Sequence, residues 1–150
     1  MNRYFATIAA IFGLDLGTKY MVKKYIPLGS RKNLIENRFS FHHIKNKGMA
    51  YNTGEQNPKF VLWLSTALAT FCFGQFCVLL FQRKQRNSSL LMAIAIMLGG
   101  AFGNLWERWR YGSVTDFLYI HAKRMPIFNV ADVAILLGGI GAMLASLWKK

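Results

Sequence analysis

Acidic residues are scarce in this chain. It carries 6 Asp and Glu against 19 Lys and Arg, which gives a formal net charge of +13. Such a charge is typical of proteins that bind nucleic acid or anionic lipid. The sequence has no recognisable nucleic-acid docking motif, and its basic residues gather between long apolar runs. This pattern favours loops that face lipid headgroups, and no nucleic-acid partner is expected.

Cysteine is also rare. Cys72 and Cys77 are the only two, and both lie in one apolar stretch. In a helix they would be separated by about 7.5 Å along the axis, a spacing that disfavours a disulfide between them. Neither lies near a histidine in the sequence, so we interpret both as small packing residues rather than metal ligands or catalytic thiols.

Several enzyme signatures are absent. The chain has no Gly-x-Ser-x-Gly string for a serine nucleophile and no Gly-x-Gly-Asp string of the presenilin-like proteases. Its acids are not clustered as metal-dependent phosphatidyltransferases require. The three histidines, His42, His43 and His121, lie in polar regions and are expected to be solvated. The sequence therefore implies no metal and no cofactor.

Apolar residues, in contrast, are abundant: 53% of the chain is hydrophobic and 15% aromatic. This is too apolar for a small soluble domain. About 20 apolar helical residues cross a bilayer core, and four segments approach that length: 4–22, 60–81, 90–106 and 130–148. We predict a single integral membrane domain over residues 1–150, all-α with four transmembrane helices. Because Asp15 and Lys19 interrupt the first segment, and no small-residue cleavage site follows, that segment is expected to be retained.

The regions between the predicted helices are unequal. Residues 23–59 and 107–129 are long and must lie on one side, whereas the connector 82–89 is short. Loose alternation over 33–44, between Gly29 and Gly48, predicts a small extramembrane β-sheet. The amino terminus, the connector and the carboxyl tail are short and basic, with no acid among them. The positive-inside rule therefore predicts that both termini lie in the cytoplasm.

Four of the six acids lie in or beside the predicted helices, namely Asp15, Glu107, Asp116 and Asp132. A charge at the centre of a membrane helix costs roughly 2.5 to 3.5 kcal/mol on insertion scales, so each of these acids should face a partner or a water-filled cavity. Asp15 and Lys19 are four residues apart on one helix face and are predicted to compensate each other, with a structural or substrate-contacting role. Glu107 and Arg108 are consistent with simple anchoring at the interface.

Asp116 and Asp132 stand in different settings. Asp116 lies in a short apolar stretch, 113–118, of a loop otherwise rich in bases, and Asp132 opens the last predicted helix. An aspartate at a helix start is often only a cap. Two carboxyls that meet can instead share one proton, so that one acts as acid and the other as base and water is activated for amide hydrolysis. Residue spacing alone leaves both interpretations open.

Four local strings give the chain a resemblance to a known family. They are Asp15-Leu-Gly-Thr-Lys19, then Asn46-Lys-Gly48-Met-Ala50-Tyr51, then Gly99-Gly-Ala-Phe-Gly103-Asn104-Leu-Trp-Glu107-Arg108 running through Gly112-Ser-Val114-Thr-Asp116-Phe117, and finally Phe128-Asn129-Val-Ala131-Asp132. In this order, and with four predicted membrane helices, the chain resembles bacterial lipoprotein signal peptidase, also called signal peptidase II or prolipoprotein signal peptidase, across its whole length. The third and fourth strings carry most of the resemblance.

The resemblance implies an aspartic endopeptidase of the bacterial inner membrane, with a small periplasmic sheet and the catalytic pair at Asp116 and Asp132. Its substrate would be a prolipoprotein whose cysteine carries diacylglycerol, cut just before that cysteine, and its other partners would be membrane lipids and globomycin-type inhibitors. The predicted site-lining or supporting residues are Asn46, Gly48, Ala50, Asn104, Arg108, Asn129 and Ala131, with Asp15 and Lys19 added as structural or substrate-contacting residues. We interpret the asparagines and Arg108 as polar holders of the substrate backbone or of the aspartates.

Two positions depart from the family pattern. Glu107 stands where the family usually has Asp, and Tyr51 stands where it usually has Phe. The longer arm of Glu107 would alter an ion pair with Arg108 or Lys19, and activity is expected to survive both changes. The alternative to a peptidase is a non-catalytic channel, transporter or scaffold. Under that alternative, replacing Asp116 or Asp132 would change conductance or assembly rather than peptide cleavage.

Overall fold

The computed structural model describes residues 1–36, 38–49, 53–82, 87–123 and 125–148. Its elements follow the order α1 (Asn2–Tyr25), β1 (Arg31–Ile35), β2 (Phe39–Asn46), α2 (Pro58–Phe81), α3 (Ser88–Tyr111), β3 (Val114–Ile120) and α4 (Val130–Leu147). In the described ranges, these four helices are each long and apolar enough to cross a membrane. The predicted fold class, four apolar helices with a small sheet, is confirmed.

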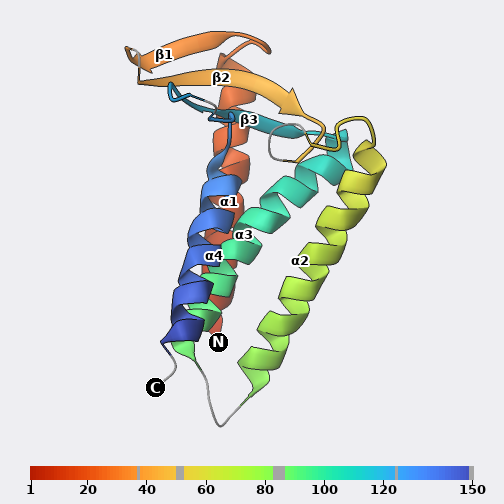
Figure 1. The fold of residues 1–150 in the computed structure, drawn as a ribbon, viewed down its shortest axis with the longest axis vertical. Coiled ribbons are helices and arrows are strands. Elements are labelled where there is room, and N and C mark those ends of the chain that lie inside the picture. The colour runs from red at the N-terminus through yellow and green to blue at the C-terminus, as the bar shows by residue number, and fades with distance from the viewer. Residues whose placement is uncertain (37, 50–52, 83–86, 124, 149–150) are drawn as a thin grey trace.

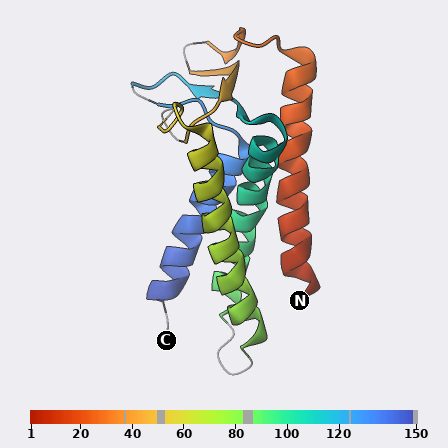
Figure 2. The ribbon, with the colours of Figure 1, turned by 90° about the vertical axis from the view of Figure 1, so that its right-hand side faces the viewer.

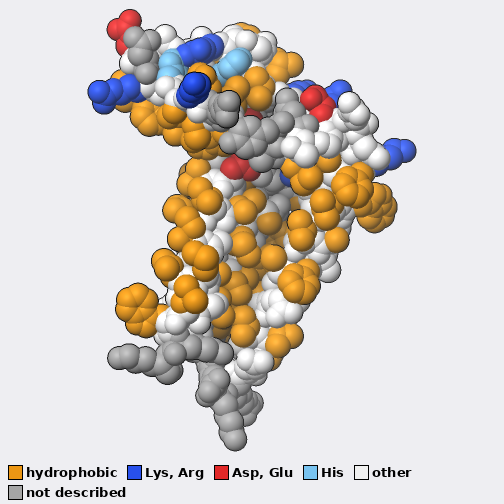
Figure 3. Space-filling model, viewed as in Figure 1, with side chains coloured by type: hydrophobic (Ala, Val, Ile, Leu, Met, Phe, Trp, Pro, Cys, Tyr) orange, Lys and Arg blue, Asp and Glu red, His pale blue; other side chains and the backbone are white. Residues whose placement is uncertain are grey.

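The helices stand side by side and the sheet lies across one end of them (Figure 1). Both chain ends lie at the opposite end of the helices, as the view turned by 90° also shows (Figure 2). Apolar side chains cover the helix shafts, whereas Lys, Arg and His side chains gather around the sheet (Figure 3). This distribution is the one expected for helices in lipid and a sheet at the membrane surface.

Helix α3 is the central helix and packs against α1, α2 and α4. Half of its apolar window (50%) is buried, against 17% for each of the other helices. Small residues permit this close packing. A Cβ at Gly99 would lie 2.8 Å from Ile11, and one at Gly138 of α4 would lie 2.7 Å from the Ala93 carbonyl oxygen.

The end of α3 leads directly into the sheet. Gly112 caps the helix in the left-handed region, with φ of 68°, and its N–H donates to the Arg108 carbonyl. Such a backbone conformation favours glycine. Strand β3 begins two residues later, so the position of Asp116 is set by the end of α3.

The sheet is antiparallel in the order β1-β2-β3. The interpretation of 113–118 as part of a loop was wrong, because residues 114–120 form β3, with Asp116 opposite Ile44 of β2. The β-branched and aromatic residues of β3 suit a strand. Its partner strand lies far earlier in the sequence, so the local pattern could not show the pairing.

Two further expectations need correction. The third predicted helix, 90–106, extends to Tyr111, so Glu107 and Arg108 are helical residues. A hydropathy window stops at charges, although a paired charge can remain inside a helix. His43 is buried rather than solvated, with 4% of its surface exposed, because its Nδ1 hydrogen-bonds to the Ile26 carbonyl oxygen at the end of α1 (2.7 Å).

Candidate active site

Asp116 lies near the start of β3 and is 2% exposed. Two amide side chains hold its carboxyl group: Asn46 Nδ2 donates to Oδ2 (3.0 Å) and Asn129 Nδ2 donates to Oδ1 (2.7 Å). Asn46 ends β2 and Asn129 precedes α4, so the carboxyl is fixed from two elements. Burial raises the pKa of Asp116 to about 6, and the charge of Asp132 adds to the rise, while the two amide donors and Lys19 oppose it.

Asp132 lies in the first turn of α4 and forms a capping box with Asn129. Its N–H donates to Asn129 Oδ1 (3.0 Å), and its own Oδ2 accepts from the Asn129 N–H (3.0 Å). The interpretation of Asp132 as a helix cap is therefore confirmed, but its side chain also makes a contact outside the cap. Asp132 Oδ1 also accepts from Asn104 Nδ2 of α3 (2.8 Å).

Asn129 and Asn104 connect the two aspartates. Besides its bond to Asp116, Asn129 Nδ2 donates to Asn104 Oδ1 (3.1 Å), which also accepts from Lys19 Nζ (2.8 Å). Because Asn104 Oδ1 accepts two donors and its Nδ2 donates to Asp132, the orientation of this amide is determined. The network therefore joins three helices and β3 around the two carboxyls.

Both aspartates line one pocket of about 300 Å³. Its remaining polar wall comes from Asn46, Asn104 and Arg108, and its apolar wall from residues such as Val114 and Phe128. A second, apolar cavity of about 290 Å³ shares Asn104, Arg108 and Ile135 with the first and extends to α2. A cleft with few polar groups and apolar walls is the usual form of a ligand site.

Arg108 lines one corner of the same pocket. Its Nη2 donates to the Gly48 carbonyl oxygen (3.0 Å), and the Gly48 N–H donates to Asn46 Oδ1 (2.8 Å). The buried Nε of Arg108 has no hydrogen-bond partner within the described part of the chain. This corner therefore offers an N–H donor beside the aspartates.

A separate group of charges lies behind the pocket, between α1 and α3. Lys19 Nζ pairs with Asp15 Oδ2 (2.7 Å), which confirms the predicted pair, and also lies 3.7 Å from Glu107 Oε2. Glu107 Oε1 accepts from Lys23 Nζ (2.7 Å), and Oε2 accepts from the Thr115 N–H (2.7 Å). The Ala131 N–H donates to Asp15 Oδ1 (2.9 Å), which links this group to the start of α4.

Glu107 has one of its two expected partners. Among the described residues it forms ion pairs with Lys19, as expected, and with Lys23, but none with Arg108. Adjacent residues of a helix point in different directions, so Arg108 faces the pocket while Glu107 faces α1. Glu107 therefore holds β3 in place, through the Thr115 backbone and side chain.

The structure gathers the predicted site residues at one end of α3, in the pocket or in the charged group behind it. Ala50 and Tyr51 are the exceptions, because they lie outside the described residues. Sequence reasoning missed Lys23 and Thr115. Lys23 could have been found from the sequence, because Asp15, Lys19 and Lys23 recur every four residues and so lie on one face of α1. No group of His, Cys, Asp and Glu able to hold a metal ion occurs among the described residues.

Comparison with known proteins shows extensive similarity. A family profile described as "Signal peptidase (SPase) II" matches residues 7–148. The lipoprotein signal peptidase of Maridesulfovibrio salexigens is 34% identical over 158 residues, covering 100% of this chain and 99% of that protein. The enzyme of the same name from Brevibacillus brevis is 36% identical over 141 residues, covering 94% of this chain and 91% of that protein.

The fold has solved counterparts. A bacterial membrane enzyme superposes with a TM-score of 0.86 at 21% identity, covering 98% of this chain and 88% of that one. A second bacterial membrane enzyme gives a TM-score of 0.83 at 21% identity, covering 100% and 96%. These two likenesses support the fold, and the family match extends over nearly the whole chain. This multi-pass membrane protein belongs to the signal peptidase II family.

Proposed function

We propose that this protein removes the signal peptide from diacylglyceryl-modified prolipoproteins by cleaving just before the modified cysteine, with Asp116 and Asp132 as its catalytic pair. The observation that carries the proposal is the arrangement of the two carboxyls, which line one pocket and are both bonded to Asn129. Family membership supplies the reaction class, and the names of the relatives supply the substrate class.

The two aspartates differ in surroundings, and this difference supports different roles for them. Asp116 is almost fully buried, and its pKa, raised to about 6, keeps a minor fraction of it protonated at neutral pH and more in mildly acidic conditions. Asp132 is only half-buried, so burial costs its carboxylate less than it costs that of Asp116. Asp132 is therefore the base and Asp116 the acid.

In the first step, Asp132 takes a proton from water while the water oxygen bonds to the scissile carbonyl carbon. Asp116 donates its proton to the carbonyl oxygen, and a neutral tetrahedral diol results. In the second step, the carbon–nitrogen bond breaks as Asp132 returns its proton to the leaving amine and Asp116 recovers a proton from the diol. The protons balance, and both aspartates end in their starting state.

The pocket corner suits a peptide backbone. The unpartnered Nε of Arg108 would donate to a substrate carbonyl, while Gly48 and Asn46 hold the arginine and Asp116 in position. The apolar cavity toward α2 continues from the same corner. It supplies a water-poor space beside the scissile bond, in keeping with a lipid-modified substrate.

The test is cleavage of a diacylated prolipoprotein by the purified full chain, with and without globomycin. Asp116→Asn and Asp132→Asn should each lose roughly 100-fold or more in turnover, the usual cost of losing a catalytic acid or base. Glu36→Gln is the matched control, because it makes the same acid-to-amide change at an exposed residue in the turn after β1. Turnover above about a tenth of the wild-type value in either aspartate variant would reject the proposal.

We also propose that both termini are cytoplasmic and that the sheet faces the periplasm. The short basic segments support this orientation, and both termini lie at the end away from the sheet (Figure 1). In a chain with Cys72 and Cys77 replaced by Ala, an impermeant thiol reagent on intact cells should label Glu36→Cys and not Ser89→Cys. The reverse labelling would overturn the orientation.

A further inference from the structure

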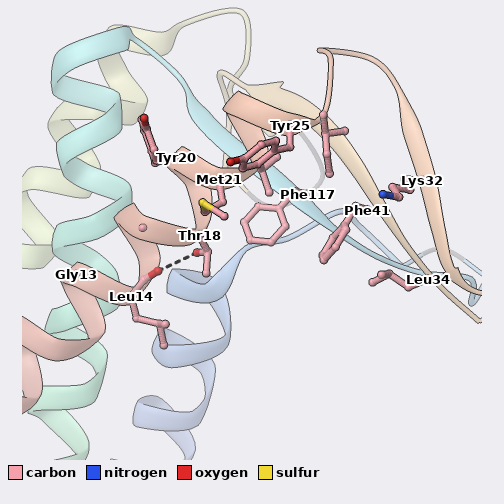
Figure 4. Close-up of a pocket in the computed structure, with 13 residues that line it drawn as sticks. Gly13, Leu14, Thr18, Tyr20, Met21, Tyr25, Lys32, Leu34, Phe41 and Phe117 are labelled. Carbon is pink, nitrogen blue, oxygen red and sulfur yellow. Dashed lines mark hydrogen bonds between the residues drawn. The ribbon is translucent and has the colours of Figure 1, made fainter.

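Another large hollow lies on the outer face of α1, beneath the sheet (Figure 4). Its volume is about 650 Å³, and we call it the α1 groove. Leu14 and Met21 line its helix side, and Leu34, Phe41 and Phe117 line its sheet side. It shares no lining residue with the pocket of the two aspartates. It is therefore a separate feature with its own explanation.

The groove deepens where α1 has glycines in place of larger side chains. Gly13 and Gly17 are one turn apart, and a Cβ at either position would meet nothing within 4 Å. Thr18, beside them, donates its hydroxyl hydrogen to the Leu14 carbonyl oxygen (2.9 Å), a bond drawn in Figure 4. Because that hydroxyl is already bonded within the helix, the groove wall is left apolar.

The walls are apolar and open. Leu14 is 58% exposed, Met21 is 52% exposed and Leu34 is 54% exposed. In water, such a surface would be unfavourable at about 25 cal/mol per Å². The helix part of the wall belongs to a membrane-crossing helix, and the sheet part covers its upper end. The groove therefore lies at the depth where lipid tails meet headgroups.

One cation stands at the sheet side of the groove. Lys32 lines it from β1, paired in register with Phe41, and Figure 4 shows both beneath the same part of the sheet. Its neighbour Arg31 points to the opposite face, where it bonds to Ser40 and His121. Lys32 has no ion pair in the part of the chain that the structure describes. The apolar walls of the groove are complementary to an acyl chain, and the ammonium group of Lys32 is complementary to a lipid phosphate.

A second copy of the chain fits this face less well. A membrane-crossing helix laid along Gly13 and Gly17 would have to pass the overhanging sheet, which closes the upper end of the groove (Figure 4). A second copy would also bring another net charge of +13 to the same surface. An anionic lipid meets neither obstacle, because its headgroup ends at the sheet and its charge is opposite.

We propose that the α1 groove binds an anionic phospholipid, with one acyl chain along Gly13 and Gly17 and the phosphate on Lys32. The bound chain fills the space between α1 and Phe117, the residue that follows Asp116 in β3. The lipid thereby supports the strand that carries Asp116. This site does not depend on the chemistry assigned to the aspartates, and its test uses no cleavage.

The test is native mass spectrometry of the detergent-purified full chain, titrated with phosphatidylglycerol or with phosphatidylcholine of the same acyl chains. The apparent Kd of the first lipid adduct should be lower for phosphatidylglycerol. Lys32→Gln should weaken phosphatidylglycerol binding about fivefold, the factor expected for one lysine at an anionic surface. Gly13→Leu should fill the groove and remove the first adduct of both lipids.

Two matched controls make the same changes elsewhere. Lys45→Gln removes an exposed lysine of the same sheet, and Gly139→Leu fills open space on α4, and both should bind as the wild type does. If Lys32→Gln binds phosphatidylglycerol with the wild-type Kd, the proposal is overturned. The Lys32→Gln measurement is sufficient for this test even if Gly13→Leu fails to fold. A dimer that disappears in Gly13→Leu would assign the groove to a second copy and would equally overturn it.

Discussion

Two groups of carboxyls lie near each other in this molecule and are held in different ways. Asp15 and Glu107 are bonded to the ammonium groups of Lys19 and Lys23. Asp116 and Asp132 are held by the amides of Asn46, Asn104 and Asn129. A cation fixes a carboxylate in its ionised form, whereas a neutral amide orients a carboxyl and leaves its proton exchangeable. The first arrangement suits structure, and the second suits proton transfer.

The largest expected effect is on the cation-held group. Lys19→Met leaves Asp15 without its ammonium partner and leaves Asn104 without its Lys19 donor, so the free energy of unfolding should fall by about 3 to 5 kcal/mol. Lys24→Met, an exposed change on the same helix, is the control. Thermal unfolding in detergent measures both. Equal unfolding temperatures for the two variants would contradict the structural role of this group.

The amide-held group should respond in the opposite way. Asp116→Asn and Asp132→Asn should change the unfolding temperature far less than Lys19→Met does, while losing turnover. Because the two residues act as one unit, the double variant should be scarcely slower than either single one. Prolipoprotein cleavage and globomycin binding measured on the same samples separate chemistry from folding. Multiplicative losses in the double variant would show that the carboxyls act independently.

Stability should also depend on pH through Asp116. Its pKa is raised from 3.8 to about 6, so the folded state binds a proton more tightly than the unfolded state. The resulting stabilisation is complete below pH 3.8 and is lost as the pH rises through about 6. Asp116→Asn has no such proton, so relative to the wild type it should gain a few degrees in unfolding temperature as the pH rises across this window. A constant difference between the two proteins would contradict the burial of a titrating Asp116.

The smallest effect is expected at Glu107. Glu107→Asp retains the charge but shortens the arm, so the carboxylate cannot keep Lys23 and the Thr115 N–H both at 2.7 Å. We expect a loss of about 1 kcal/mol in the free energy of unfolding, comparable to one weakened hydrogen bond, with turnover within about threefold of the wild-type value. A large loss of turnover at unchanged stability would instead assign Glu107 to the reaction.

The sequence predicted the parts of this molecule that depend on local patterns. Long apolar runs predicted the four helices, and the four-residue spacing of Asp15 and Lys19 predicted their ion pair. The meeting of Asp116 with Asn46 and Asn129 was not predictable from spacing, because it depends on the pairing of β2 with β3. The resemblance to a family supplied those residues, and the physical reason for them came only with the fold.

Of the two partners expected for Glu107, Lys19 is confirmed, and Arg108 was wrong for a related reason. Adjacent charges in a sequence suggest a pair, and Glu107 precedes Arg108 directly. On a helix the two side chains diverge, and the unexpected partner, Lys23, comes from the first helix of the chain. Burial of His43 likewise depends on its contact with Ile26, a tertiary feature that its polar sequence neighbourhood did not reveal.

The pairing of Asp15 with Lys19 also bears on biogenesis. Helix α1 is synthesised first, and Glu107, the other acid that approaches Lys19, follows only after more than half of the chain. An isolated helix entering the bilayer with one uncompensated charge would be strongly disfavoured. Because the two charges are one turn apart, α1 brings its own counter-ion and can leave the translocon with the charge of Lys19 compensated, while its other basic residues lie near the helix ends. Its later partners then assemble on a helix that is already in the membrane.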